Sequence, residues 1–174
     1  MSDLLFIVLL LCELLFILFG VFLIWSWLTQ TPFYPSSAKD LDKLFRSGKL
    51  KLPKDIKFID IGSGDGRIVL WAAKKGFKAY GIEYNPFLSL LSRVKIFLTG
   101  KNKKATIYNK DFNKHGFGTY NVAYLYIFNE HMDKMKDKLF NEMQKGSVIV
   151  SKIFKFSNIE PDEKIGKFNI YYIK

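Results

Sequence analysis

Three glycines stand at every second position, Gly62, Gly64 and Gly66, directly after an apolar run that contains Asp60. The apolar run is typical of a buried strand, and the residues after Gly66 have the pattern of a helix. Glycine lets the backbone come close to a ligand, and the N–H groups at a helix start point toward whatever lies in front of them. This strand, glycine loop and helix therefore predict a site for a nucleoside-bearing cofactor, with Ser63 in the loop.

The spacing of the glycines separates two classes of such cofactors. The dinucleotide fingerprint is G-x-G-x-x-G. Counted from Gly62, its third glycine falls at position 67, where this chain has Arg67. An acid at the mouth of the strand, Asp60, would repel a pyrophosphate but attract an ammonium group. S-adenosylmethionine carries an ammonium and a sulfonium and no phosphate, so we predict this methyl donor, and not NAD, as the cofactor.

Two further elements predict the rest of the cofactor site. Glu83 follows Asp60 by 23 positions, at the end of the second expected strand, where an acid can accept hydrogen bonds from both ribose hydroxyls. Asp111, after the third strand, can accept from the adenine amino group, and Phe112 can pack against the ring. The plainer alternatives are a solvated strand end for Glu83, a common turn residue for Asp111, and an ordinary strand-to-helix turn for the glycine loop. The predicted cofactor-binding residues are Asp60, Gly62, Ser63, Gly64, Gly66, Glu83, Asp111 and Phe112.

Strands and helices are expected to alternate along the part of the chain that carries these residues. Strands are expected at 57–61, 78–82, 105–108, 121–128, 146–153 and 168–173, and helices from a Ser36 or Ser37 cap to Gly48, at 67–75, at 86–98 and at 130–143. Residues 154–167 are expected to form a loop or a short strand. Strands joined by helices of about ten residues predict an α/β fold, a mostly parallel sheet with helices on both faces.

The N-terminal part of the chain is strongly apolar. Residues 4–28 hold nineteen Leu, Ile, Val and Phe residues and one charge, Glu13, enough to cross a hydrocarbon core of about 30 Å. A cleaved signal peptide would have a shorter apolar region of about 7–15 residues after a positive start, whereas here the start carries Asp3. We therefore expect a transmembrane anchor at 1–28, an extended linker at 29–37 with two prolines, and the folded domain at 38–174.

Charge predicts the orientation and the surroundings of this domain. No Lys or Arg precedes the apolar segment and several follow it, so the positive-inside rule places the N-terminus outside and the domain in the cytoplasm. The single cysteine, Cys12, lies within the segment, which fits a reducing compartment. The net charge of +11 favours contact with an anionic membrane surface. A nucleic-acid partner is the alternative, and the anchor disfavours it.

Several motifs together resemble a family of small membrane-anchored class I methyltransferases that methylate lysines in mitochondrial inner-membrane proteins, among them the ATP synthase c-subunit and the adenine nucleotide translocase. The matching stretches are 32–37 (Pro-Phe-Tyr-Pro-Ser-Ser), 59–69 with its Asp-Gly-Arg extension, 72–73 (Ala-Ala) with 76–77 (Gly-Phe), and 81–86 (Gly-Ile-Glu-Tyr-Asn-Pro), together with Arg93 and the apolar N-terminus. The resemblance implies a Rossmann-like class I methyltransferase sheet, preceded by one transmembrane helix, and S-adenosylmethionine as methyl donor.

The stretch after the fourth strand differs from that of related enzymes. Methyltransferases of adenine N6 and of glutamine have an Asn/Asp-Pro-Pro-aromatic motif there, whereas this chain has Tyr-Ile-Phe-Asn-Glu-His at 126–131. The difference disfavours planar-amine acceptors. A lysine acceptor must lose a proton, and the candidate catalytic residues are Asn129 and Glu130 at the rim of the fourth strand and Tyr34 in the linker. The alternative for Asn129 and Glu130 is the capping of a helix.

We therefore predict a membrane-anchored, S-adenosylmethionine-dependent methyltransferase that modifies lysine in a membrane-embedded protein and uses no metal ion. Three alternatives remain open at this stage: methylation of a small molecule, lipid or quinone; a cofactor-binding membrane module without catalysis; and RNA methylation, which the anchor disfavours.

Overall fold

The structure of the chain is a computed structural model that describes residues 2–28 and 36–174. It consists of two compact units, residues 1–34 and 35–174, each of which is considered by itself. In the first unit, helix α1 (Ser2–Leu28) is long and apolar enough, over Asp3–Ile24, to cross a membrane. Its side chains from Asp3 to Phe19 are exposed. A helix that is apolar on all sides needs an apolar surrounding.

The second unit is built on a seven-stranded sheet in the order β3-β2-β1-β4-β5-β7-β6. The strands are β1 (Lys57–Ile61), β2 (Lys78–Glu83), β3 (Ala105–Asn109), β4 (Val122–Leu125), β5 (Val148–Lys152), β6 (Glu163–Ile165) and β7 (Phe168–Tyr172). Strands β1 to β5 are parallel, whereas β7 runs antiparallel to both β5 and β6. The predicted α/β sheet is confirmed, with an antiparallel pair at one edge.

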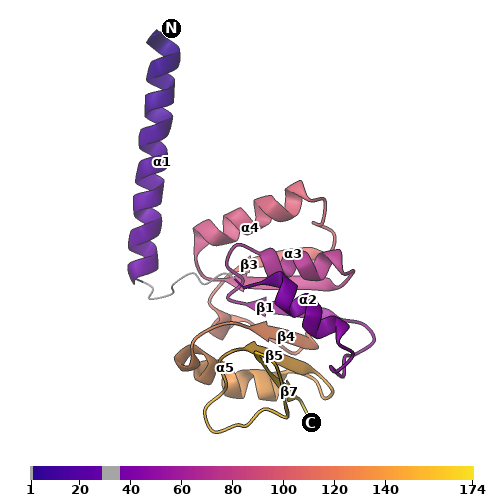
Figure 1. Cartoon of the computed structure of the whole chain (residues 1–174). Helices are drawn as coiled ribbons and strands as arrows, with labels where there is room; N and C mark the ends of the chain where they lie inside the picture. The colour runs from indigo at the N-terminus through magenta and orange to yellow at the C-terminus, as the bar shows by residue number, and fades with distance from the viewer. Residues whose placement is uncertain (1, 29–35) are drawn as a thin grey trace. The chain divides into compact units, whose positions relative to one another are not determined.

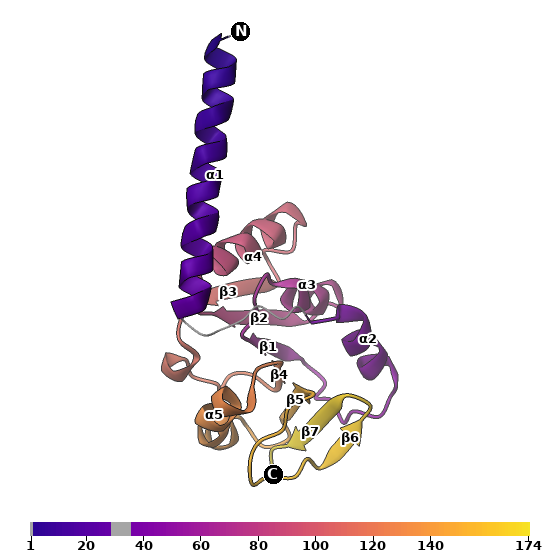
Figure 2. The same cartoon turned by 60° about the vertical axis from the view of Figure 1, so that its left-hand side comes forward.

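Helices cover both faces of this sheet, as the sequence predicts. Figures 1 and 2 show α3 and α4 on one side of the sheet and α5 on the other. The helices are α2 (Ala38–Arg46), α3 (Arg67–Lys74), α4 (Pro86–Leu98) and α5 (Asn129–Glu142), with a short 3-10 turn η1 (Phe112–Lys114).

Alternate side chains of the central strands pack into two separate cores, one on each face of the sheet. Phe58, Val122 and Val148 pack in the core under α2 and α3, whereas their neighbours Ile59 and Ala123 pack in the core under α5. Successive side chains of a strand point to opposite faces, and a parallel strand covered on both faces is apolar at every position. The continuous apolar runs of the sequence follow from this arrangement.

The largest difference from the expected elements lies at β4. The predicted strand 121–128 ends at Leu125, because the chain turns away from the sheet before α5 begins. Helix α2 begins as expected, since the Ser37 side chain accepts a hydrogen bond from Asp40 N at 3.4 Å. The other candidate cap, Ser36, is instead 3.1 Å from the hydroxyl of Tyr124, which donates to it. Residues 154–167, expected to form a loop or a short strand, contain the short strand β6.

Candidate active site

The glycine loop joins β1 to α3 in a conformation that requires its glycines. Gly62, Gly64 and Gly66 have φ of 76°, 54° and 74°, a region that residues with a Cβ rarely adopt. The loop is held against β2 because the N–H groups of Gly62 and Ser63 both donate to the carbonyl of Ile82 at 2.9 Å. The glycine spacing thus reflects a backbone conformation, and it places the loop at the carboxyl end of the sheet.

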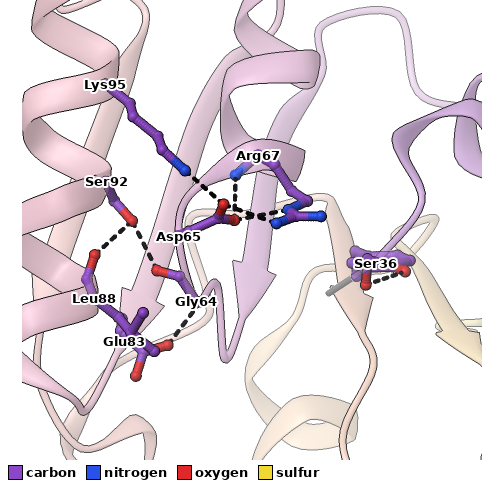
Figure 3. A network of polar contacts seen from close by, with 9 residues as sticks. Ser36, Gly64, Asp65, Arg67, Glu83, Leu88, Ser92 and Lys95 are labelled. Carbon is purple, nitrogen blue, oxygen red and sulfur yellow. Dashed lines mark hydrogen bonds and ion pairs between the residues drawn. The ribbon is translucent and has the colours of Figure 1, made fainter. Parts of the chain in front are cut away.

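A second reason for glycine is close packing against α4. A Cβ on Gly66 would lie 2.8 Å from the Cβ of Ser92, nearer than real Cβ contacts come. The Ser92 hydroxyl donates to the carbonyl of Gly64 at 2.7 Å and is also 2.9 Å from the carbonyl of Leu88 (Figure 3). The loop and α4 therefore approach each other with only small side chains between them.

Glu83, at the end of β2, connects the loop to the start of α4. One carboxylate oxygen accepts from Gly64 N at 2.7 Å and the other accepts from Asn85 N at 2.8 Å. Burial raises the pKa of Glu83, and these N–H groups counteract part of that rise. The backbone N–H of Tyr84 also lowers the pKa of Glu83. An ionised carboxylate has about four lone-pair positions, so Glu83 keeps acceptor capacity for donors such as the predicted ribose hydroxyls.

Asp60 is buried at the same end of β1, with 3% of its surface exposed. Burial, together with the negative charges of Glu83 and Asp65, raises the pKa of Asp60 well above its usual range. No side-chain hydrogen bond to Asp60 is found among residues 2–28 and 36–174. A cation beside a buried carboxyl group stabilises the ionised form of that group. The surroundings of Asp60 therefore fit an ammonium group.

Asp65, which lies in the glycine loop itself, is the third acid near this site, and two cations neutralise it. Its carboxylate accepts from Arg67 Nε at 2.8 Å and from Lys95 Nζ at 2.6 Å (Figure 3). Burial alone would raise the pKa of Asp65, but the two cations outweigh it and lower the pKa to about 2. The sequence interpretation missed this cluster; the Asp-Gly-Arg run was the available signal, whereas Lys95 comes from α4, 30 positions away.

Asp111 and Phe112 lie beyond the end of β3. Asp111 caps η1 through one carboxylate oxygen, which accepts from the backbone N–H and the side-chain amide of Asn113 at 2.9 and 3.0 Å. Phe112 is half-buried, with its ring 6.5 Å from that of His131 at the start of α5. Asp111 therefore acts as a turn residue in this structure, and its predicted role toward adenine stays a prediction.

The remaining predicted residues have different surroundings. Asn129 and Glu130 are exposed in the first turn of α5, and the N-cap is Phe128, so Asn129 does not cap the helix. Ser63 is buried, and its hydroxyl lies against Gly81 of β2. Tyr34 lies outside the described residues. The part of the chain that the structure describes contains no group of three His, Cys, Asp or Glu side chains placed to hold a metal ion.

One strained turn follows β5, at the same end of the sheet. Ile153 has φ of 69°, and Phe154 N donates to the carbonyl of Lys152 at 2.8 Å, which makes a tight γ-turn centred on Ile153. The buried Asn169 amide holds the turn by donating to the carbonyls of Ile153 and Phe154 at 3.2 and 2.8 Å. The sequence does not predict this turn, because nothing in an Ile-Phe pair signals a left-handed residue.

Comparisons with known proteins agree with this geometry. The sequence model of the family described as the ANTKMT methyltransferase domain matches residues 60–163. The lysine N-methyltransferase of the ATP synthase c-subunit from Mus musculus is 33% identical over 136 residues, which are 78% of this chain and 54% of that protein. The adenine nucleotide translocase lysine N-methyltransferase of the same species is 29% identical over 139 residues, 79% of this chain and 59% of that protein. The chain thus spans little more than half the length of these relatives.

A solved structure is similar over most of its length. The crystal structure of an RNA methyltransferase from Salinibacter ruber in complex with S-adenosyl-L-homocysteine has a TM-score of 0.72 and 25% identity, covering 80% of this chain and 94% of that chain. S-adenosyl-L-homocysteine is S-adenosylmethionine without its transferable methyl group.

Proposed function

This chain belongs to the family of the ANTKMT methyltransferase domain, and on that premise we propose that it transfers the methyl group of S-adenosylmethionine to a lysine side chain of a membrane protein. The family, the methyltransferase class and the cofactor predicted from the sequence are confirmed. The lysine acceptor is supported by the names of the two mouse relatives. The single observation that carries the proposal is the pair of buried carboxyl groups, Asp60 and Glu83, at the glycine loop.

Each residue of the site has a proposed task toward the cofactor. Asp60 would hold the ammonium group, Glu83 would accept hydrogen bonds from the ribose hydroxyls, and the loop backbone from Gly62 to Gly66 would face the nucleoside. When bound, S-adenosylmethionine supplies an electrophilic methyl group on its sulfonium. Asp65 cannot compete for the ammonium group, because Arg67 and Lys95 already neutralise it.

The acceptor amine must be uncharged when it attacks the methyl group. Asn129 and Glu130 are the proposed groups on the acceptor side, because they are exposed where the chain leaves β4. The amide oxygen of Asn129 can orient the amine by accepting one of its N–H groups, and the carboxylate of Glu130 can take its proton. Methyl transfer then depends mainly on holding the two reactants in line and excluding water. Tyr34 is a further candidate on this side.

We propose that α1 anchors the enzyme in a membrane, with the N-terminus outside and the domain in the cytoplasm. Support comes from the apolar stretch Asp3–Ile24 and from the Lys and Arg residues that follow it. A tether of this kind raises the effective concentration of membrane-embedded substrates. Deletion of residues 1–28 should therefore lower methylation of a membrane substrate while leaving cofactor binding intact.

The decisive experiment identifies the acceptor directly. Full-length protein is incubated with native membranes and S-adenosylmethionine labelled in its methyl group, and the labelled species are identified by mass spectrometry. We expect methyl-lysine in a membrane protein, and no labelling with Asp60→Ala. Label in the lipid extract would replace the protein acceptor by a lipid or quinone, and cofactor binding without any labelled product would identify a non-catalytic module.

RNA is the second candidate acceptor. It is favoured by the similarity to the Salinibacter ruber enzyme and by the net charge of +11. The same experiment distinguishes it, because labelled RNA would then appear and treatment with ribonuclease would remove the signal.

A further inference from the structure

Helix α4 buries small polar side chains and exposes large apolar ones. Its buried residues are Ser89, Ser92 and Ile96. Large apolar side chains point outward instead, with exposed fractions of 62% for Leu90, 70% for Phe97 and 76% for Leu98. A helix that covers a sheet normally turns its apolar stripe inward. The outer stripe of α4 consists of Leu90, Leu91, Val94, Phe97 and Leu98, which share one face by their spacing of three and four residues.

The cofactor site explains the buried face of α4 but not the outer stripe. Small residues are needed inside, because a Cβ on Gly66 would already lie 2.8 Å from the Cβ of Ser92 and the Ser92 hydroxyl bonds the loop at Gly64. Nothing in this packing requires leucine and phenylalanine on the opposite side of the helix. A contiguous exposed apolar patch of this kind marks a surface that meets a partner.

The charges around the stripe identify the kind of partner. Residues 84–110 contain no Asp or Glu, and they contain six cations: Arg93, Lys95, Lys101, Lys103, Lys104 and Lys110. Lys103 and Lys104 are exposed in the turn that follows α4. An apolar stripe bordered by Lys and Arg is the pattern of a helix that lies in the interface of an anionic bilayer.

We propose that the outer stripe of α4 is a membrane-docking surface, which inserts its apolar side chains between the headgroups of an anionic bilayer. The inference extends the proposed membrane location of the enzyme. Helix α4 has 13 residues, so it is about 20 Å long and too short to cross a core of about 30 Å. It therefore lies along the surface. Because α4 begins at Pro86, three residues after Glu83, docking brings the cofactor edge of the sheet next to the bilayer.

A second copy of the chain fits this surface less well. Lys95 is paired with Asp65, but residues 84–110 supply no acid for the other five cations. Two α4 surfaces in contact would bring two sets of these five together, and like charges at that distance repel. Headgroup phosphates and anionic lipids complement the same charges. The bilayer is therefore the occupant that the charge pattern favours.

The test places one fluorophore on each side of the domain. Full-length protein carrying Cys12→Ala receives a single cysteine by Val94→Cys in the outer stripe or, as the matched control, by Lys134→Cys, which is exposed on α5 across the sheet. Each variant is labelled with NBD and reconstituted into phosphatidylcholine–phosphatidylserine vesicles, with or without a nitroxide on the lipid acyl chains. We expect quenching several-fold stronger at position 94 than at position 134, and weaker in vesicles without phosphatidylserine.

Two outcomes would overturn the inference. Equal quenching at the two positions would show that α4 stays in water. A blue-shifted spectrum at position 94 without nitroxide quenching would show a protein occupant, such as a second copy or a substrate helix.

Replacing Leu91 and Phe97 by serine should reduce quenching at position 94 to the control level, while calorimetric binding of S-adenosyl-L-homocysteine stays unchanged. Quenching does not depend on methyl transfer, so a failure of the proposed activity and a failure of docking give different results.

Discussion

The carboxylate of Glu83 accepts the backbone N–H of Gly64 at 2.7 Å, across 19 positions of the chain. Its second oxygen accepts the N–H of Asn85, which in turn caps α4 through its own side chain. The acid that we expect to bind the ribose therefore also fixes the glycine loop relative to α4. Cofactor affinity and local stability depend on the same two oxygen atoms.

Replacement of Glu83 by glutamine should weaken both properties. The amide places an NH2 group against one of the two backbone N–H groups, which leaves a buried donor unsatisfied at a cost of about 1–3 kcal/mol. We expect a lower temperature of thermal unfolding and weaker binding of S-adenosyl-L-homocysteine by calorimetry. Glu130→Gln is the matched control, because Glu130 is exposed. Unchanged cofactor affinity in the Glu83 variant would exclude Glu83 from the site.

Gly66→Ala should destabilise the domain more than Gly100→Ala does. Both glycines have similar φ, 74° and 65°, so both substitutions carry the left-handed strain of about 1–2 kcal/mol. Only at Gly66 does the new Cβ meet Ser92, whereas nothing lies within 4 Å of the Cβ at Gly100. Overpacking adds about 1–3 kcal/mol. Equal losses of unfolding free energy would show that the loop can move away from α4.

The ion pairs of Asp65 should make the domain sensitive to acid. The pKa of Asp65 is lowered to about 2 in the folded state, below its ordinary value in the unfolded chain. The group therefore contributes about 2 kcal/mol at neutral pH, which is lost as the pH falls from about 4 to about 2. Asp65→Asn should be less stable at pH 7 and lose less on acidification. Circular dichroism across this pH range measures both, and parallel curves would contradict the assignment.

Asp60 should show the opposite dependence on pH. Because its pKa is raised in the folded state, the folded protein holds this proton more tightly, and the stability of the unliganded protein falls as the pH rises through that pKa. An ammonium group beside Asp60 favours the ionised form, so at a pH below the raised pKa of Asp60 the binding of S-adenosylmethionine should release a proton. Calorimetry in two buffers of different ionisation enthalpy measures this release, which Asp60→Asn should abolish. Equal proton release in the variant would remove Asp60 from the ammonium site.

Replacement of Ile153 by glycine relieves the left-handed strain of the turn, but glycine loses more backbone entropy on folding. We therefore expect the unfolding free energy to stay unchanged or to rise by up to about 1 kcal/mol. Asn169→Ala should instead destabilise the domain by about 1–3 kcal/mol, because two hydrogen bonds are lost and the carbonyl of Phe154 keeps only the Ser151 hydroxyl as a donor. Thermal unfolding of the two variants compares these effects. A large loss in the glycine variant would mean that the Ile153 side chain, not the conformation, maintains the turn.

The sequence predicts those features that depend on neighbouring residues. Gly62, Gly64 and Gly66 are recognisable because each adopts a backbone conformation that favours glycine, and Glu83 because strand ends of a parallel sheet meet at one edge. The Lys95–Asp65 pair could not be predicted, since it depends on how α4 crosses the loop. The end of β4 at Leu125 could not be predicted from the sequence either, because the apolar residues continue to Phe128 after the chain has left the sheet.

The strand order has a consequence for biosynthesis. Strand β5 pairs with β7 on its outer side, so its edge stays open until the ribosome has made residues 168–172. By then α1 has long emerged from the ribosome. The domain therefore completes its sheet only after these residues have been made, and until then the open edge of β5 is the surface that a chaperone would have to protect.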